Sequence, residues 1–257
     1  MNLGLWGDRV RAAVIHLGFS LAAAALAALL FFGIWYPYPY REISGGRELF
    51  LLVVAVDVVM GPLMTLAVFN PAKPRKELRR DLAVIGLLQI AALVYGLWTV
   101  AVSRPVHLVF ELTRYRVVHA IDVEPALLNR APPDLRSLPL MGPTMLSVRE
   151  FKSSKESFDA TMAALQGASI GAQPDLWQSY EKAKAQIIAS AKPVAELKAR
   201  FPGRINDINA ALSSRGGSAA NQANFGYIPL ASRKTFWTVL VDTQTAEVVG
   251  FVAIDPY

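Results

Sequence analysis

The sequence of 257 residues contains no cysteine, so disulfide bonds, thiolate metal sites and cysteine nucleophiles are excluded. It also lacks a GxSxG elbow, an HExxH helix, a P-loop and a dinucleotide-binding fingerprint. His107 and His119 could approach each other across a hairpin, but two imidazoles without a third ligand make a poor zinc site. We therefore expect no metal, no cofactor and no enzymatic activity.

A strong charge of one sign is also missing. Residues 1–103 carry 9 Lys and Arg against 6 Asp and Glu, and residues 104–257 carry 17 against 14. The net charge of +6 is therefore shared evenly between the two halves, whereas nucleic-acid-binding domains concentrate basic residues. We expect no nucleic-acid partner.

Long apolar runs are absent after Val102 but fill most of the chain before it. Hydrophobic residues make up 53% of the sequence, too many for an ordinary soluble domain. A helix needs roughly 20 residues to cross about 30 Å of hydrocarbon, and residues 12–35, 49–69 and 82–102 meet this requirement. The sequence predicts a three-helix transmembrane region at residues 1–103, in contact with the lipid bilayer, and a globular domain at residues 104–257.

The first apolar run has two interpretations, because Arg9 and Arg11 before an alanine-rich segment also occur in signal peptides. The run continues as far as Trp35, which favours an uncleaved anchor. Cations kept in the cytoplasm set the orientation of membrane helices. The cations near the N-terminus predict a cytoplasmic N-terminus and an extracytoplasmic C-terminal domain, and the cations in the second connection, residues 70–81, predict the same orientation.

Aromatic residues and prolines alternate directly after the first predicted span, in the segment 35–40. Amphipathic rings favour the headgroup region, and the two prolines end the helix. Trp35, Tyr36 and Tyr38 are therefore expected to form an interfacial collar. It either has no partner or contacts another membrane helix.

Polar residues inside the second and third spans require partners, because lipid provides none. Asp57 lies about 12 Å below the end of its span, at a depth similar to Tyr95, whose hydroxyl could hydrogen-bond it. Gln89 and Ser20 lie deeper. Two small residues, Gly61 and Thr65, follow Asp57 on the same helix face. Pro62 lies beside them and is expected to kink the helix. This face either packs inside the bundle or forms a groove for a client helix.

The C-terminal domain begins and ends with strand-like sequences. Residues 106–110 and 116–121 predict one β-hairpin, and residues 235–241 and 246–254 predict another. Helices are expected between them, at residues 151–165, at residues 175–199 with a break at Pro193, and through Leu212, followed by a flexible loop at residues 213–224. We predict an α+β fold, an antiparallel sheet with inserted helices.

Several motifs together resemble the TfpX/TfpZ family of type IV pilin accessory proteins. They are WYP at 35–37, VDxxxGPxxT at 56–65, FNPxK at 69–73, DLxxIxxLQ at 81–89, YG at 95–96 and RPVxxxFE at 104–111. The resemblance extends from Trp35 to about Val123 and is weaker beyond. Thr113 stands where the family pattern leads us to expect an acidic residue.

The resemblance implies a multi-pass protein of the bacterial inner (cytoplasmic) membrane with a periplasmic C-terminal domain. Such a protein would bind and stabilise a type IV pilin, major or minor, like a chaperone. The residues expected to bind the partner are those singled out in the membrane region: Trp35, Tyr36, Tyr38, Asp57, Gly61, Pro62, Thr65, Gln89 and Tyr95.

Two other functions fit the same architecture. A membrane-anchored immunity protein would use its periplasmic domain to neutralise a secreted interbacterial toxin. An extracytoplasmic sensor fits less well, because the predicted cytoplasmic loop has only about a dozen residues and no output domain follows the exported one.

Overall fold

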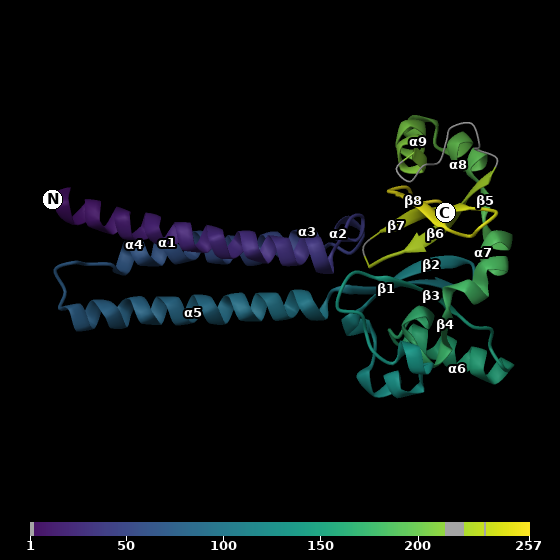
Figure 1. Cartoon of the computed structure of the whole chain (residues 1–257), viewed down its shortest axis with the longest axis horizontal. Helices are drawn as coiled ribbons and strands as arrows, with labels where there is room; N and C mark the ends of the chain where they lie inside the picture. The colour runs from purple at the N-terminus through teal and green to yellow at the C-terminus, as the bar shows by residue number, and fades with distance from the viewer. Residues whose placement is uncertain (1–2, 214–223, 234) are drawn as a thin grey trace. The chain divides into compact units, whose positions relative to one another are not determined.

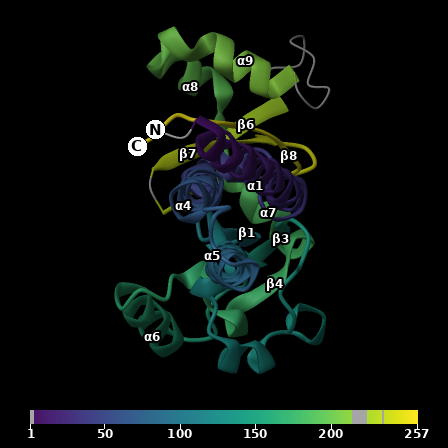
Figure 2. The same cartoon turned by 90° about the vertical axis from the view of Figure 1, so that its left-hand side faces the viewer.

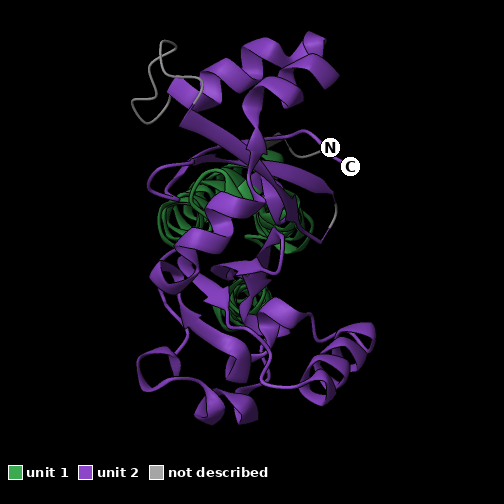
Figure 3. Ribbon diagram, turned by 90° about the vertical axis from the view of Figure 1, so that its right-hand side faces the viewer, with its two compact units in different colours: residues 1–41, 45–103 green, residues 42–44, 104–257 purple. Residues whose placement is uncertain are grey.

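The structure is a computed structural model that describes residues 3–213, 224–233 and 235–257. Two compact units divide the chain, one with residues 1–41 and 45–103 and the other with residues 42–44 and 104–257 (Figure 3). Most of the loop expected at residues 213–224 lies outside the described residues.

The first unit contains the three long apolar helices (Figure 1). Helix α1 (Leu3–Leu30) runs into the π-helical turn η1 (Phe31–Trp35). The middle helix combines α3 (Gly46–Ala55), η2 (Val56–Met60) and α4 (Gly61–Val68), and the last is α5 (Arg75–Val102). A short helix, α2 (Tyr40–Ile43), precedes α3. Each long helix is long and apolar enough to span a membrane, which confirms a multi-pass architecture.

The middle helix passes through Pro62 without ending. A proline lacks the backbone N–H that a regular helix needs, and its ring crowds the carbonyl one turn earlier. The wider π-helical turn η2 lies directly before Gly61 and Pro62, which is where such a turn relieves the crowding by a proline ring. The expected disturbance at Pro62 therefore takes the form of a π-turn inside a continuous helix.

The second unit is built on one mixed β-sheet whose strands follow the order β4-β3-β1-β2-β6-β7-β8, with β5 paired to β6. The strands are β1 (Pro105–Glu111), β2 (Arg114–His119), β3 (Thr144–Val148), β4 (Trp177–Ser179), β5 (Lys192–Pro193), β6 (Phe225–Ala231), β7 (Phe236–Asp242) and β8 (Val248–Val252). The predicted hairpins β1–β2 and β7–β8 are both antiparallel, as expected.

Two features of the sheet differ from the expectation. The pairs β1–β3 and β2–β6 are parallel, so the sheet is mixed and not antiparallel throughout. The strands β3 and β6 were not predicted; β6 carries Gly226 and Pro229, which usually argue against a central strand. The three-helix anchor followed by an α+β domain is nevertheless confirmed.

The helix expected at residues 175–199 is wrong as a single element. Short pieces replace it: η7 (Pro174–Leu176), β4, η8 (Tyr180–Ala183), α7 (Lys184–Ser190), β5 and α8 (Val194–Arg200). Pro193 does mark a division, as expected, because β5 ends there and α8 begins. The helices α6 (Ser154–Leu165) and α9 (Ile205–Ser213) lie where they were predicted.

Two hydrophobic clusters bury the faces of the sheet. One surrounds Trp177 beside α6, and the other lies where α8 and α9 pack over β6, β7 and β8 (Figure 1). The remaining 3₁₀ helices connect the elements: η3 (Ala120–Asp122), η4 (Pro125–Arg130), η5 (Pro133–Leu135), η6 (Ile170–Ala172) and η9 (Pro202–Arg204).

A buried carboxylate fixes the tip of the first hairpin. Glu111 is 1% exposed, and its Oε1 accepts from Arg114 Nε at 2.9 Å and from Arg116 Nε at 2.7 Å. Its Oε2 accepts from the backbone N–H of Gly171 in η6 at 2.7 Å. Because each oxygen has a strong donor, this carboxylate holds the hairpin against a segment 60 residues away.

We expect Glu111→Gln to lower the free energy of unfolding of the C-terminal domain by about 2 kcal/mol, since two charge-assisted bonds weaken together. Chemical unfolding of the full-length protein in detergent, followed by tryptophan fluorescence, measures this loss. Glu196→Gln, on the exposed surface of α8, is the matched control and should change stability by less than about 0.5 kcal/mol. Equal effects of the two substitutions would contradict the role assigned to Glu111.

Candidate functional site

The middle membrane helix packs against both α1 and α5. Two open cavities, of about 390 Å³ and about 230 Å³, lie between α1 and α5. His16, Phe19 and Gly86 line both cavities, which therefore form one continuous surface that we call the α1–α5 groove. Figure 2 looks along the three helices that form it.

Polar side chains from all three helices meet at this groove. His16 Nδ1 lies 2.5 Å from Thr65 Oγ1, and Gln89 Nε2 donates to the backbone carbonyl of Asp57 at 3.1 Å. Ser20, one helical turn after His16, is buried and also lines the groove. Lipid offers no hydrogen-bond partner, so these bonds between helices satisfy the polar groups and hold the bundle together.

The Asp57 carboxylate is the exception to this pairing. The residue is 8% exposed, and its Oδ1 has no hydrogen-bond partner among the residues that the structure describes. Asp57 lines both the groove and a third cavity, of about 190 Å³, between the middle helix and α5. A buried acceptor without a donor costs free energy, and a donor on another membrane helix would remove that cost.

The small residue at Gly61 permits the close contact between the middle helix and α5. A Cβ atom at this position would lie 1.8 Å from Gln89 Nε2 and 2.5 Å from Gln89 Cδ. The Gln89 amide can therefore reach the Asp57 carbonyl only because residue 61 has no side chain. The face that carries Gly61 and the buried Thr65 packs within the bundle, and Thr65 also lines the groove.

The expected hydrogen bond between Tyr95 and Asp57 is wrong. Tyr95 lines the same small cavity as Asp57, but it is 67% exposed and its ring packs beside Trp98, with centroids 5.9 Å apart. Pro62 is half-buried between the π-turn and the rest of α4.

The aromatic segment after α1 divides into buried and exposed residues. Tyr36 is 1% exposed, stacks on Phe31 at 4.3 Å between centroids, and donates its hydroxyl to the carbonyl of Val100 at 3.4 Å. Trp35 packs against the same cluster and is half-buried. Tyr38 is 66% exposed, beneath the guanidinium of Arg41. Of the three, Tyr38 is thus the most accessible to a partner.

Sequence reasoning missed His16, which holds Thr65 at the groove. A signal was present, because an ionisable side chain inside an apolar span indicates an internal polar contact. His16 and Ser20 are also four residues apart and therefore lie on one helix face.

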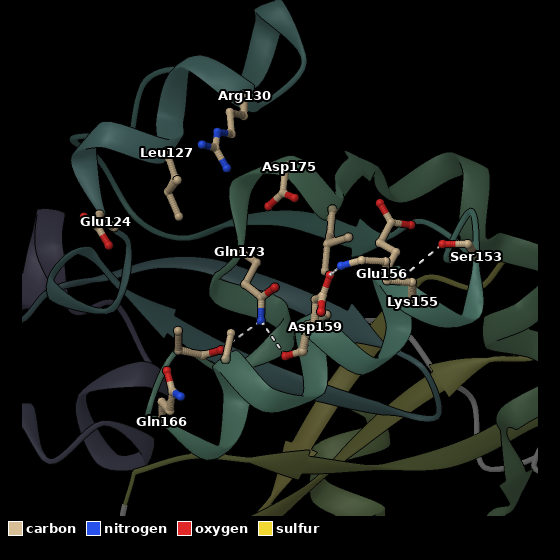
Figure 4. A pocket seen from close by; sticks show the side chains of 14 residues that line it. Glu124, Leu127, Arg130, Ser153, Lys155, Glu156, Asp159, Gln166, Gln173 and Asp175 are labelled. Atoms are coloured by element: carbon tan, nitrogen blue, oxygen red, sulfur yellow. Dashed lines mark hydrogen bonds and ion pairs between the residues drawn. The ribbon is translucent and has the colours of Figure 1, made fainter.

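The C-terminal domain has an open cleft of about 660 Å³ between η4 and α6 (Figure 4). Exposed charges of both signs line it, and two acidic residues are paired, Asp159 with Lys155 and Glu156 with Arg149, each at 2.7 Å. Gln173 donates to two backbone carbonyls, each at 3.0 Å. None of the residues lining the cleft has a buried polar side-chain atom without a partner in the described part of the chain. We assign no chemistry to this cleft.

Each of the two buried histidines of the domain has a partner at Nδ1, whereas the Nε2 of each has none among the described residues. His107 Nδ1 lies 2.8 Å from Thr144 Oγ1 and its ring packs edge-on against Trp177, whereas His119 Nδ1 pairs with Asp122 at 3.0 Å. Within residues 3–213, 224–233 and 235–257, no three His, Asp or Glu side chains gather in a way that could hold a metal ion.

Comparison with known proteins connects this architecture to fimbriae. The chain is 35% identical to the fimbrial assembly protein of serogroup I from Dichelobacter nodosus over 245 residues, which cover 95% of this chain and 94% of that protein. It is 34% identical to the serogroup E1 protein of the same organism over 246 residues, with coverage of 95% and 94%. The family model described as fimbrial assembly protein FimB matches residues 5–45. No solved structure matches the chain.

The contact at Gly61 predicts a specific coupling. Gly61→Ala should displace the Gln89 amide and lower bundle stability by about 1 kcal/mol, because the hydrogen bond to Asp57 is lost. In a Gln89→Ala background the same change should cost almost nothing. Unfolding of the four proteins in mixed micelles measures the coupling, and an equal cost of Gly61→Ala in both backgrounds would exclude it.

Burial lowers the pKa of His107 to about 4. The unfolded chain therefore binds a proton near pH 6.5 that the folded domain does not bind until about pH 4. The free energy of unfolding is therefore highest above pH 6.5 and decreases as the pH falls toward 4. The loss should reach on the order of 3 kcal/mol. His107→Gln should remove this part of the pH dependence and leave the part due to His119, whose pKa burial also lowers. Unfolding measured from pH 8 to pH 4 tests this, and identical profiles for variant and wild type would refute it.

Proposed function

Because the chain belongs to the family of fimbrial assembly proteins, we propose that it is an inner-membrane accessory protein that binds and stabilises a type IV pilin and supports pilus assembly. The similarity covers 95% of the chain, so it includes both the membrane bundle and the C-terminal domain. The motifs that resemble the TfpX/TfpZ family support the same role. The relatives are named for fimbrial assembly, which favours this function over toxin immunity.

The observation that carries the proposal is the α1–α5 groove with its unpaired acceptor, Asp57 Oδ1. A pilin waits in the membrane as one apolar helix with an exported head, and such a helix fits an open groove between two others. Apolar walls supply close packing, and the Asp57 carboxylate accepts a hydrogen bond from a donor on the client helix. The protein thus acts by binding rather than by catalysis.

The proposed orientation places the N-terminus in the cytoplasm and the C-terminal domain in the periplasm. Arg9 and Arg11 precede the apolar run at residues 12–35, and residues 70–81, which connect the second and third apolar runs, hold five Lys and Arg against two Asp and Glu. Within that connection Lys73 pairs with Asp81 at 2.7 Å, which joins two of the TfpX/TfpZ-like motifs. The exported domain then lies on the side where the pilin head waits.

Photo-crosslinking in native membranes tests the binding surface. A crosslinking residue at Phe19 or Ile90 faces the groove. One at Leu21 lies about 160° around its helix from Phe19, and one at Val84 lies about 120° around its helix from Ile90, so both point away from the groove. We expect an adduct with the pilin from the first pair only. Equal adducts from all four positions, or none, would count against the groove.

The Asp57 carboxylate provides the second test. Asp57→Leu should lower the yield of the Phe19 adduct and the steady-state level of the pilin several-fold, because the donor on the client helix loses its acceptor. Leu87→Ala, at a lipid-exposed position of α5, is the matched control and should leave both unchanged. Pilin recovered equally with all three proteins would argue against a role for Asp57.

A further inference from the structure

Large apolar side chains are exposed at two main places in the C-terminal domain. One group lies along α6, with Phe158 64% and Leu165 77% exposed. The other is Ile121, Leu140 and Met141, exposed by 59%, 73% and 74%. We call this second group the rim. Scattered apolar residues on a surface need no explanation, but the rim gathers around one residue, Arg104.

Hydrogen bonds hold the rim next to Arg104. The N–H of Ala120, the residue before Ile121, donates to the Arg104 carbonyl at 2.9 Å. The guanidinium of Arg104 donates from Nη2 to the carbonyl of Pro139, the residue before Leu140, at 3.3 Å. The rim is therefore tied to the start of β1 from two directions.

The loop that carries Leu140 and Met141 is also built to hold these side chains outward. Leu138 packs against the hydrophobic cluster around Trp177 and anchors the loop on one side. Gly142, with a φ of 55°, turns the chain back into β3 on the other. The two apolar side chains between these anchors remain at the surface.

Chain connectivity places this rim at the membrane. The apolar part of α5, residues 82–102, spans about 31 Å at 1.5 Å per residue, so Val102 lies at the edge of the hydrocarbon. Arg104 follows two residues later and lies at most about 7 Å farther along the chain. The headgroup region is about 5–8 Å deep on each side of the bilayer. Arg104 therefore lies within that region, and the rim residues are next in sequence to residues bonded to Arg104.

From these observations we infer that the rim is a lipid-contact surface, with Leu140, Met141 and Ile121 inserted into the headgroup boundary of the leaflet from which α5 emerges. Their burial in lipid removes apolar surface from water, and the tie to Arg104 keeps them at the required depth. The rim thus anchors the domain at a second place, in addition to the covalent link through residue 103.

The absence of cysteine makes a direct test possible, because single-cysteine variants label at one position. Leu140→Cys and Met141→Cys would carry the environment-sensitive dye NBD, and Leu165→Cys on α6 is the matched control for an exposed apolar residue. The full-length proteins are placed in phosphatidylcholine vesicles without any other protein. We expect 5-doxyl phosphatidylcholine to quench NBD fluorescence at positions 140 and 141 at least threefold more strongly than at position 165. Aqueous iodide should quench the dye more strongly at position 165 than at positions 140 and 141.

A second measurement tests whether the apolar side chains cause the insertion. With the dye at Ile121→Cys, the double change Leu140→Glu and Met141→Glu should reduce lipid quenching at least twofold, whereas Phe158→Glu and Leu165→Glu should not. Positions 140 and 141 that are as accessible to iodide as position 165 would overturn the inference. Shielding that appears only after a pilin is added to the vesicles would also overturn it and assign the rim to a protein partner.

Discussion

The membrane region depends on one constraint, that polar groups inside a bilayer must find their partners within the protein. The middle helix makes such contacts on both sides, with His16 of α1 at Thr65 and with Gln89 of α5 at the Asp57 backbone, while the Asp57 carboxylate keeps one oxygen without a partner among the described residues. The same contacts determine which helices touch. Because α1 and α5 each pack on the middle helix, the surface between them stays open, and the accessible groove is a result of how the bundle pairs its polar atoms.

The C-terminal domain also pairs buried polar side chains within the protein. Its first hairpin enters the sheet directly after α5, and Glu111 at the hairpin tip is paired with two arginines and a backbone N–H. Tyr180 joins distant elements in a similar way, accepting from Tyr115 and donating to the Ala246 carbonyl, each at 2.6 Å. These buried hydrogen bonds fix the first hairpin against the elements packed beside it.

Features governed by local physics could be predicted from the sequence. The spans were found because hydrocarbon thickness demands about 20 apolar residues, and the hairpins because their strands are adjacent along the chain. Strand β6 was missed because Pro229 and Gly226 argue against a strand, and only its neighbours β2 and β7 make it one. His16 and Thr65 are 49 residues apart, and no periodicity connects them. The sequence suggested Tyr95 as a partner of the Asp57 carboxylate and placed Gln89 in a separate polar contact. Which of these side chains faces Asp57 depends on helix rotation, which the sequence does not determine, and Gln89 reaches the Asp57 backbone carbonyl.

The late position of β6 in the sequence has a consequence for biogenesis. The strands β4, β3, β1 and β2 form one half of the sheet and β6, β7 and β8 the other, and the two halves join along the β2–β6 pair. If the domain is exported from its N-terminal end, as the proposed orientation requires, the edge of β2 stays unpaired until residues beyond 225 have crossed the membrane. Folding would then be completed only when translocation ends, and a truncated or stalled chain would display an open strand edge that quality-control proteases can recognise.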